Sequence, residues 1–189
     1  MIVLGLTGSI GMGKTTTAAL FAARGVPVWD ADAAVHRLYG PGGAAVTPLA
    51  AAFPDVVRNE TVDRSILREI VTTDPAGLKR IEAIVHPLVA ADRAAFLAET
   101  DAPLVLLDIP LLFETGLQVD TSITVTAPPD VQRDRVLSRG TMTEAIFEDI
   151  LSRQMPDVEK RARADYVIET TTPEAAARQV DTILEELRP

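Results

Sequence analysis

The chain has 189 residues, long enough for one domain with a substantial core, and its 47% hydrophobic and 24% charged residues are ordinary globular values. Cysteine is absent, which excludes disulfides and thiolate chemistry, and no apolar run approaches the roughly 18 residues that a membrane span needs. The formal net charge of −9 argues against a nucleic-acid-binding surface, so we expect a cytoplasmic protein that binds neither nucleic acid nor membrane.

The first predicted elements are a buried strand over Ile2–Thr7, a glycine-rich loop and a helix. The loop reads Gly-Ser-Ile-Gly-Met-Gly-Lys-Thr over residues 8–15 and fits the phosphate-loop pattern G-x-x-x-x-G-K-[ST] at every fixed position. Glycines allow consecutive backbone N–H groups to turn toward an anion, and the helix start adds its positive dipole end. Lys14 can reach the outer phosphates, and the Thr15 hydroxyl can help to hold Mg²⁺. The sequence therefore predicts a nucleoside-triphosphate site.

Four further runs read as strands, with helical segments between them: Val26–Asp30, Leu104–Ile109, Ser122–Thr126 and Tyr166–Glu169. The runs are almost continuously apolar, as in a parallel sheet that is covered on both faces. This order predicts a doubly wound α/β domain. Ligands of such sheets bind beyond the carboxyl ends of the strands, where the candidate residues of this chain lie.

Two long insertions interrupt this order. Residues 31–100 are too many for one crossover and read mainly as helices, which predicts a helical subdomain facing the phosphate loop. Residues 138–163 carry arginines and apolar residues at helical spacing, which favours a mobile lid. We thus expect one domain over residues 1–189, with a core of 1–30, 101–137 and 164–189, a substrate-binding insertion over about 31–100 and a lid over about 138–163.

Aspartates follow two of the predicted strands. Asp30 and Asp32 end the second strand, and one of them is either a general base or a Mg²⁺ ligand; alternatively, Asp32 is the N-cap of the next helix. Asp108 ends an apolar strand in the form of a Walker B element, and it either contacts Mg²⁺ or caps the turn before Pro110. The apolar run at residues 111–114 can line a substrate pocket.

Basic residues supply the remaining candidates. Arg135 and Arg139 are predicted at positions i and i+4 on one helix face, where they either neutralise charge on transferring phosphates or are merely solvated. Both arginines belong to a cluster of basic residues, and we expect about half of these side chains to lie on solvated helix faces. The other members of the cluster are Arg133, Arg153, Lys160, Arg161 and Arg163. His86-Pro87 is predicted to kink a helix, which indicates either a shaped pocket or a structural kink.

Together these residues resemble the dephospho-coenzyme A kinase family. The shared motifs are Gly5-Leu6-Thr7-Gly8, Ile10-Gly11, Gly13-Lys14-Thr15-Thr16, Asp30-Ala31-Asp32, Pro41-Gly42, Asp63-Arg64, His86-Pro87, Pro110-Leu111-Leu112-Phe113-Glu114, Gln132-x-x-Arg135-x-x-x-Arg139 and Gln154. They follow the family's order from residue 5 to residue 154. The combination of Asp-Ala-Asp, His-Pro and Pro-Leu-Leu-Phe-Glu is the specific part, because many enzymes share the phosphate loop.

The resemblance implies a P-loop, nucleoside-monophosphate-kinase-like core with a five-stranded parallel sheet, a helical substrate subdomain and a lid. It implies transfer of the γ-phosphoryl group of ATP, with Mg²⁺, to the ribose 3′-hydroxyl of dephospho-coenzyme A. By position, Asp32 is then the general base. Arg139, with Arg135 behind it, binds ATP and stabilises charge from the lid. The residues that surround the ATP phosphates are Gly8, Gly11, Met12, Gly13, Lys14, Thr15 and Thr16. The substrate side comprises His86, Leu111, Leu112, Phe113 and Glu114.

The chain departs from the family pattern at three places. Glu169-Thr170 stands where the family tends to have asparagine and glycine, which leaves the adenine contacts to backbone groups. Met12 replaces a small serine, and Asp108 stands where the family often accepts an apolar residue.

Rival functions are another small-molecule kinase, acting on a nucleoside monophosphate or a sugar acid, and a non-catalytic nucleotide switch. The GTPase motif Asn-Lys-x-Asp is absent, which argues against a guanine-binding switch. The sequence does not indicate which oligomeric state the protein adopts.

Overall fold

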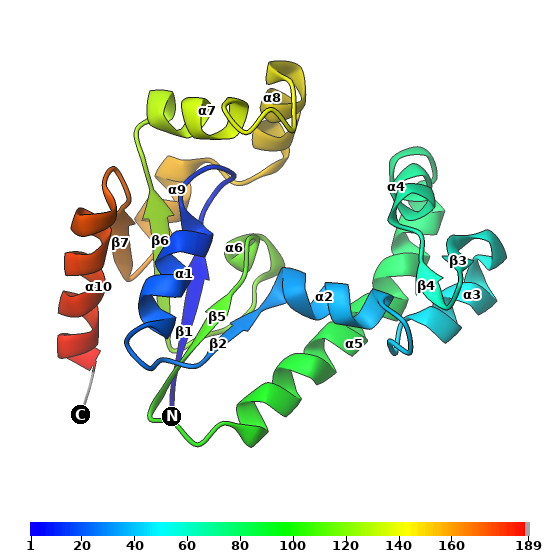
Figure 1. Cartoon of the computed structure of the whole chain (residues 1–189), viewed down its shortest axis with the longest axis horizontal. Coiled ribbons are helices and arrows are strands. Elements are labelled where there is room, and N and C mark those ends of the chain that lie inside the picture. Colours follow the sequence, from blue (N-terminus) through cyan, green and yellow to red (C-terminus); the bar gives the residue numbers. More distant parts are fainter. Residues whose placement is uncertain (188–189) are drawn as a thin grey trace. The chain divides into compact units, whose positions relative to one another are not determined.

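The computed structural model describes residues 1–187 and divides the chain into two compact units (Figure 1). The first unit combines residues 1–29 with those from residue 101 onward, and the second comprises residues 30–100. The second unit begins within a residue of the predicted insertion. No helix among the described residues is both long and apolar enough to cross a membrane.

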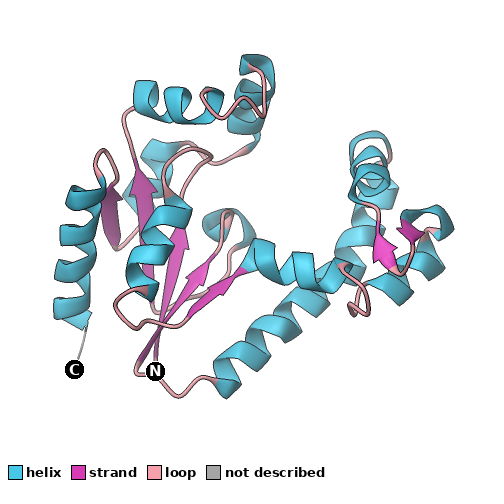
Figure 2. Ribbon diagram, viewed as in Figure 1, coloured by secondary structure: helices cyan, strands magenta, loops and turns pink. Residues whose placement is uncertain are grey.

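A five-stranded parallel sheet forms the centre of the first unit (Figure 2). Its strands, in spatial order, are β2 (Val28–Asp30), β5 (Leu104–Asp108), β1 (Ile2–Thr7), β6 (Thr121–Thr126) and β7 (Tyr166–Glu169). Each strand lies within two residues of its predicted bounds, and β5 is buried along its whole length, as its continuous apolar run predicted. The predicted α/β fold with a five-stranded parallel sheet is confirmed.

Helices cover both faces of this sheet, because side chains of each strand alternate between the faces. Leu4 and Leu6 of β1 share one core cluster with Phe21 of α1 (Lys14–Ala22) and Val180 of α10 (Pro173–Leu187). On the opposite face, Gly5 lies against α6 (Leu112–Thr115), so closely that a Cβ there would stand 2.8 Å from the Leu112 side chain. The phosphate loop thus follows a strand that is fixed on both faces.

Three more helices of the first unit are α7 (Pro129–Leu137), α8 (Glu144–Arg153) and α9 (Asp157–Arg163). The prediction that Arg135 and Arg139 share one helix face was wrong. Helix α7 ends at Leu137, and Gly140 then adopts a left-handed φ of 64°, which turns the chain away. Arg139 therefore lies in the connection to α8 rather than on a helix.

The second unit is mainly helical, as predicted, and has its own apolar core. Its elements are α2 (Ala31–Tyr39), α3 (Val46–Ala52), the 3₁₀ helix η1 (Pro54–Val56), the antiparallel strands β3 (Val57–Arg58) and β4 (Thr61–Val62), α4 (Arg64–Thr73) and α5 (Pro75–Glu99). The hairpin was not predicted. Asn59 and Glu60 both have positive φ at its turn, as a two-residue hairpin requires, but they lack the glycine that marks such turns in a sequence.

The helix predicted around His86-Pro87 is present, and the kink of its axis at this point stays a prediction. Helix α5 runs through Pro87 without a break over 25 residues. Proline removes one helical hydrogen bond, but Ile81 and Val85 of the same helix are buried in the second core, which holds this segment helical.

Candidate active site

The phosphate loop joins β1 to α1 in a backbone shape that requires glycine. Gly11 and Gly13 have φ values of 78° and 88°, which side chains disfavour. A Cβ at Gly11 would also stand 2.6 Å from the Val136 side chain of α7. Gly13 is the N-cap of α1 and offers no side chain to it, so the first N–H groups of this helix are not capped by a side chain. These N–H groups suit an anion.

Side chains from three separate elements hold the backbone of this loop. Gln132 of α7 donates from Nε2 to the Ile10 carbonyl at 2.7 Å, and the Ile10 N–H donates to Gln154 Oε1 at 3.2 Å. Thr170, which follows β7, donates from its hydroxyl to the Met12 carbonyl at 2.7 Å. The loop is therefore fixed before any ligand binds. The sequence indicated Gln132 and Gln154 only as parts of family motifs, and Thr170 only as a departure from the family pattern.

Arg135 reaches the phosphate loop through Thr170. Its guanidinium donates to the Thr170 carbonyl at 2.5 Å, to the Thr170 hydroxyl at 3.0 Å and to the Thr171 carbonyl at 3.4 Å. The Thr170 hydroxyl thus accepts from Arg135 while it donates to Met12. Arg135 was predicted to bind ATP, and in this structure it fixes the segment after β7.

Lys14 points to the carboxyl end of the central strands. Its ammonium lies 2.5 Å from Oδ1 of Asp108, whose side chain is 3% exposed. Asp108 pairs with Leu6 in the sheet register, directly before the loop. A buried carboxylate of this kind orients the lysine and compensates its charge. The exposed Thr15 hydroxyl lies one residue along the same helix.

The motif at residues 110–114 has a structural function that the sequence did not indicate. Lys160 of α9 is completely buried, although it was counted in a cluster expected to be half solvated. Its Nζ lies 2.8 Å from Glu114 Oε1 and donates to the Pro110 carbonyl at 3.3 Å. The Met155 N–H also donates to Glu114, at 3.0 Å. Burial raises the pKa of Glu114, but the bonds from Lys160 and Met155 outweigh it and the net pKa is lowered.

The apolar residues of this motif differ in exposure. Leu111 is 40% exposed, whereas Leu112 is 1% exposed and packs against β1. Arg139 is exposed, and among the described residues no hydrogen bond or ion pair engages its guanidinium. Leu111 and Arg139 are thus accessible to a ligand, while Leu112 belongs to the core.

Asp32 and His86 belong to the second unit. Asp30 is the N-cap of α2, because its Oδ1 accepts from the Ala33 N–H at 2.9 Å. The alternative in which Asp32 caps this helix is therefore wrong. Asp32 lies in the first turn with an exposed carboxylate that forms no hydrogen bond within the described chain. His86 is likewise exposed, on α5.

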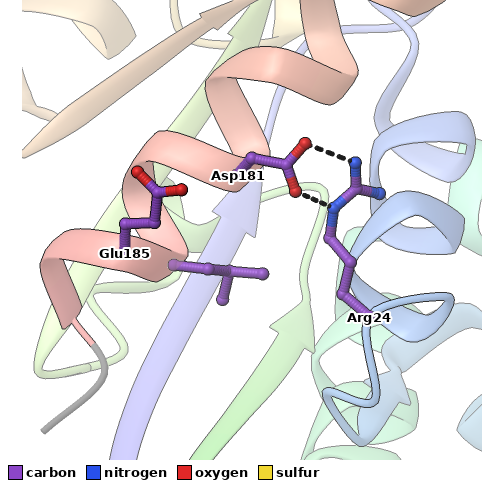
Figure 3. Close-up of a pocket in the computed structure, with 4 residues that line it drawn as sticks. Arg24, Asp181 and Glu185 are labelled. Atoms are coloured by element: carbon purple, nitrogen blue, oxygen red, sulfur yellow. Dashed lines mark hydrogen bonds and ion pairs between the residues drawn. The ribbon is translucent and has the colours of Figure 1, made fainter.

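A small surface pocket lies at the other end of α1 from the phosphate loop (Figure 3). Arg24, Asp181, Leu184 and Glu185 line it. Arg24 Nη2 donates to Asp181 Oδ2 at 2.8 Å, and its Nε donates to Oδ1. This pair fastens the end of α1 to α10, and the pocket contains none of the predicted site residues.

A parallel sheet that leads through a phosphate loop into α1, with Lys14 at the strand ends, defines a phosphate-loop kinase fold. A sequence model of the dephospho-CoA kinase family matches residues 2–175. The dephospho-CoA kinases of Cereibacter sphaeroides and Ruegeria pomeroyi are 62% and 57% identical to this chain, each over 98% of it and 95% of the relative. The chain belongs to the dephospho-CoA kinase family.

Solved structures agree with the fold. A crystal structure of a Thermus thermophilus protein has a TM-score of 0.90 at 37% identity and covers 100% of this chain and 98% of that one. The dephospho-CoA kinase from Campylobacter jejuni has a TM-score of 0.66 at 21% identity, covering 98% of this chain and 96% of that one. The second likeness supports the fold alone.

Proposed function

We propose that this protein transfers the γ-phosphoryl group of ATP to the ribose 3′-hydroxyl of dephospho-CoA, which gives CoA and ADP in the final step of CoA synthesis. The observation that carries the proposal is the phosphate loop, shaped by Gly11 and Gly13 and held by side chains of three elements, in a chain that the family matches over residues 2–175.

The phosphate loop supplies position and charge. The N–H groups over residues 11–16 surround the ATP phosphates, and the Lys14 ammonium neutralises charge on the β- and γ-phosphates. Because Gln132, Gln154 and Thr170 already fix the loop, little reorganisation accompanies binding.

Mg²⁺ fits the residues at the strand ends. The Thr15 hydroxyl and the Asp108 carboxylate are hard oxygen ligands, and Mg²⁺ usually completes its shell with phosphate oxygens and water. Among the described residues, no cluster of three acidic, histidine or cysteine side chains forms a site of its own, as expected for a metal that arrives with ATP. Bound Mg²⁺ would neutralise phosphate charge.

Asp32 acts as the general base. Its carboxylate is exposed and is not the helix cap, so it is available to accept the proton of the 3′-hydroxyl and to orient that oxygen toward the γ-phosphorus. His86, Leu111, Phe113 and Glu114 contact the substrate, whereas the predicted contact from Leu112 is dropped because this side chain is buried in the core.

Arg139 contributes positive charge from the lid. We restrict the moving part of the lid to residues 138–153, because Lys160 and Glu114 bind α9 and the Met155 backbone to the sheet. Backbone groups of residues 169–171 bind adenine, with Arg135 holding this segment in place.

The direct test is incubation with Mg²⁺, ATP and dephospho-CoA, followed by mass spectrometry for the gain of one phosphoryl group. Lys14→Ala is the control and should lose about 100-fold or more in turnover. Nucleoside monophosphates and sugar acids serve as rival acceptors. Preference for a rival acceptor, or nucleotide binding without transfer, would refute the proposal.

A further inference from the structure

His36 of α2 and Arg64 of α4 form a polar pair in the second unit. Arg64 Nη2 lies 3.1 Å from His36 Nδ1, and the Arg64 guanidinium lies 5.8 Å from the centroid of the Tyr39 ring. Burial raises the pKa of Tyr39, while the charge of Arg64 opposes that rise, and the Arg64 guanidinium lies over the ring face of this phenol. Both His36 and Arg64 are exposed.

This pair presents hydrogen-bond donors and no acceptor. A guanidinium has only donors, so His36 Nδ1 must accept the bond and Nε2 must carry the imidazole proton. Within the described chain, Arg64 has no carboxylate partner. The nearby carboxylates are engaged: Asp63 caps α4 through the Ser65 and Ile66 N–H groups, and Asp92 pairs with Arg37 at 2.7 Å. A positive charge with free donors and no counter-charge suits an anion.

The position of the pair relative to Asp32 indicates which anion. Asp32 and His36 are four residues apart on α2, so they lie on one helix face, about 6 Å apart along the axis at the helical rise of 1.5 Å per residue. In a ribonucleoside 5′-diphosphate, the 3′-oxygen and the 5′-phosphate are likewise separated by a few bonds of one sugar. A ribose whose 3′-hydroxyl meets Asp32 can therefore place its 5′-phosphates beside His36.

We infer that Arg64 and the Nε2–H of His36 bind the 5′-diphosphate of the acceptor nucleotide. The inference rests on the proposed function, because it takes Asp32 as the base at the 3′-hydroxyl. Two groups on one face of α2 then fix both ends of the ribose: the hydroxyl to be phosphorylated and the phosphate that identifies the acceptor. The pair explains how a diphosphate-bearing acceptor is distinguished from a free nucleoside.

Arg64→Ala tests this binding site, with Arg68→Ala as the matched control. Arg68 is an exposed arginine one turn along the same helix, so the control removes the same charge from α4. Losing a hydrogen bond to a charged group should raise the KM for dephospho-CoA about 10-fold to 100-fold in Arg64→Ala, leaving kcat and the KM for ATP within about twofold. Arg64→Lys keeps the positive charge but loses the paired N–H donors of the guanidinium. Its KM for dephospho-CoA should therefore lie between those of Arg64→Ala and Arg68→Ala.

Competitive inhibitors separate diphosphate binding from a general loss of the subdomain. At saturating ATP, inorganic pyrophosphate and adenosine each compete with one half of the acceptor. In Arg64→Ala the inhibition constant of pyrophosphate should rise about tenfold or more, and that of adenosine should stay constant. Equal rises for both inhibitors, no competition by pyrophosphate in the unaltered protein, or kinetics identical to Arg68→Ala would each overturn the inference.

Calorimetric titration of dephospho-CoA without ATP distinguishes this inference from the kinase proposal. Binding that depends on Arg64, in a protein that forms no CoA, would refute the proposed function and support the diphosphate site. Active enzyme whose affinity for dephospho-CoA is unchanged in Arg64→Ala would refute the site and support the function. Absence of binding to the unaltered protein would refute the site as well.

Discussion

The buried pair of Lys160 and Glu114 predicts an asymmetric effect on stability. Lys160 is fully buried, whereas the Glu114 side chain is 21% exposed and keeps a bond from the Met155 N–H. Breaking a buried ion pair costs about 3–5 kcal/mol, because one charge is left without compensation. Glu114→Gln leaves the buried ammonium with the Pro110 carbonyl, so it should cost that full amount. Lys160→Met leaves a partly solvated carboxylate and should cost less, about 2–3 kcal/mol.

The double variant shows whether the pair itself is responsible. Methionine is apolar and similar in length to lysine, and glutamine still accepts the Met155 N–H, so Lys160→Met with Glu114→Gln should recover most of the loss of Glu114→Gln. The free energy of unfolding is measured by urea titration with circular dichroism. Lys79→Met, an exposed lysine on α5, is the matched control and should stay within about 0.5 kcal/mol. Additive losses in the double variant, or a larger loss for Lys160→Met than for Glu114→Gln, would refute the reasoning.

The same pair predicts a dependence on pH. Burial alone would raise the pKa of Glu114, but hydrogen bonds from Lys160 and from the Met155 N–H lower it in the folded protein. A carboxyl group with a lowered folded pKa stabilises the fold above its unfolded pKa, and this contribution is lost as the pH falls below about 4.3 toward the folded value. Urea titrations at a series of acidic pH values should show a shallower decline in the double variant, and an equal decline would contradict this origin of the effect.

Three further predictions concern catalysis. Asp32→Asn should lower kcat about 100-fold or more with stability and ATP affinity unchanged, as checked by turnover, thermal unfolding and nucleotide binding on one preparation; surviving turnover would place the base elsewhere. Arg139→Ala should lower kcat more than it raises the KM for ATP, and a change confined to KM would make Arg139 a uniform binding residue. Gln154→Leu frees the Ile10 N–H and should weaken ATP binding by about 1 kcal/mol, roughly fivefold, with Gln154→Glu affected less because it keeps the acceptor; equal affinities would refute this.

Much of the fold could be predicted because its signals are local. Continuous apolar runs gave the five strands within two residues, and the phosphate loop is a contiguous motif. Errors arose where tertiary packing decides. Lys160, expected in a cluster that is half solvated, is internal because Glu114 of another element neutralises it. This cause is not visible in the residues next to Lys160.

The candidate site was predicted in its chemistry but not in its contacts. The motifs named Gln154, yet its partner Ile10 lies 144 residues earlier, and Thr170 lies 158 residues from Met12. No periodicity or local pattern encodes such pairs. The helix cap was also misjudged: the sequence offered Asp32 for this position, and only the hydrogen bond from the Ala33 N–H shows that Asp30 takes it.

The polar groups of the phosphate loop divide into two sets with separate tasks. Gln132, Gln154 and Thr170 bind the Ile10 and Met12 backbone, away from the start of α1. The N–H groups that follow Gly13 have no side-chain cap, so they can bind phosphate. We expect the first set not to compete with the ligand and therefore to hold the loop in one shape with and without ATP. Substitutions in that set should therefore change affinity through loop rigidity, even though none of these side chains needs to touch the nucleotide.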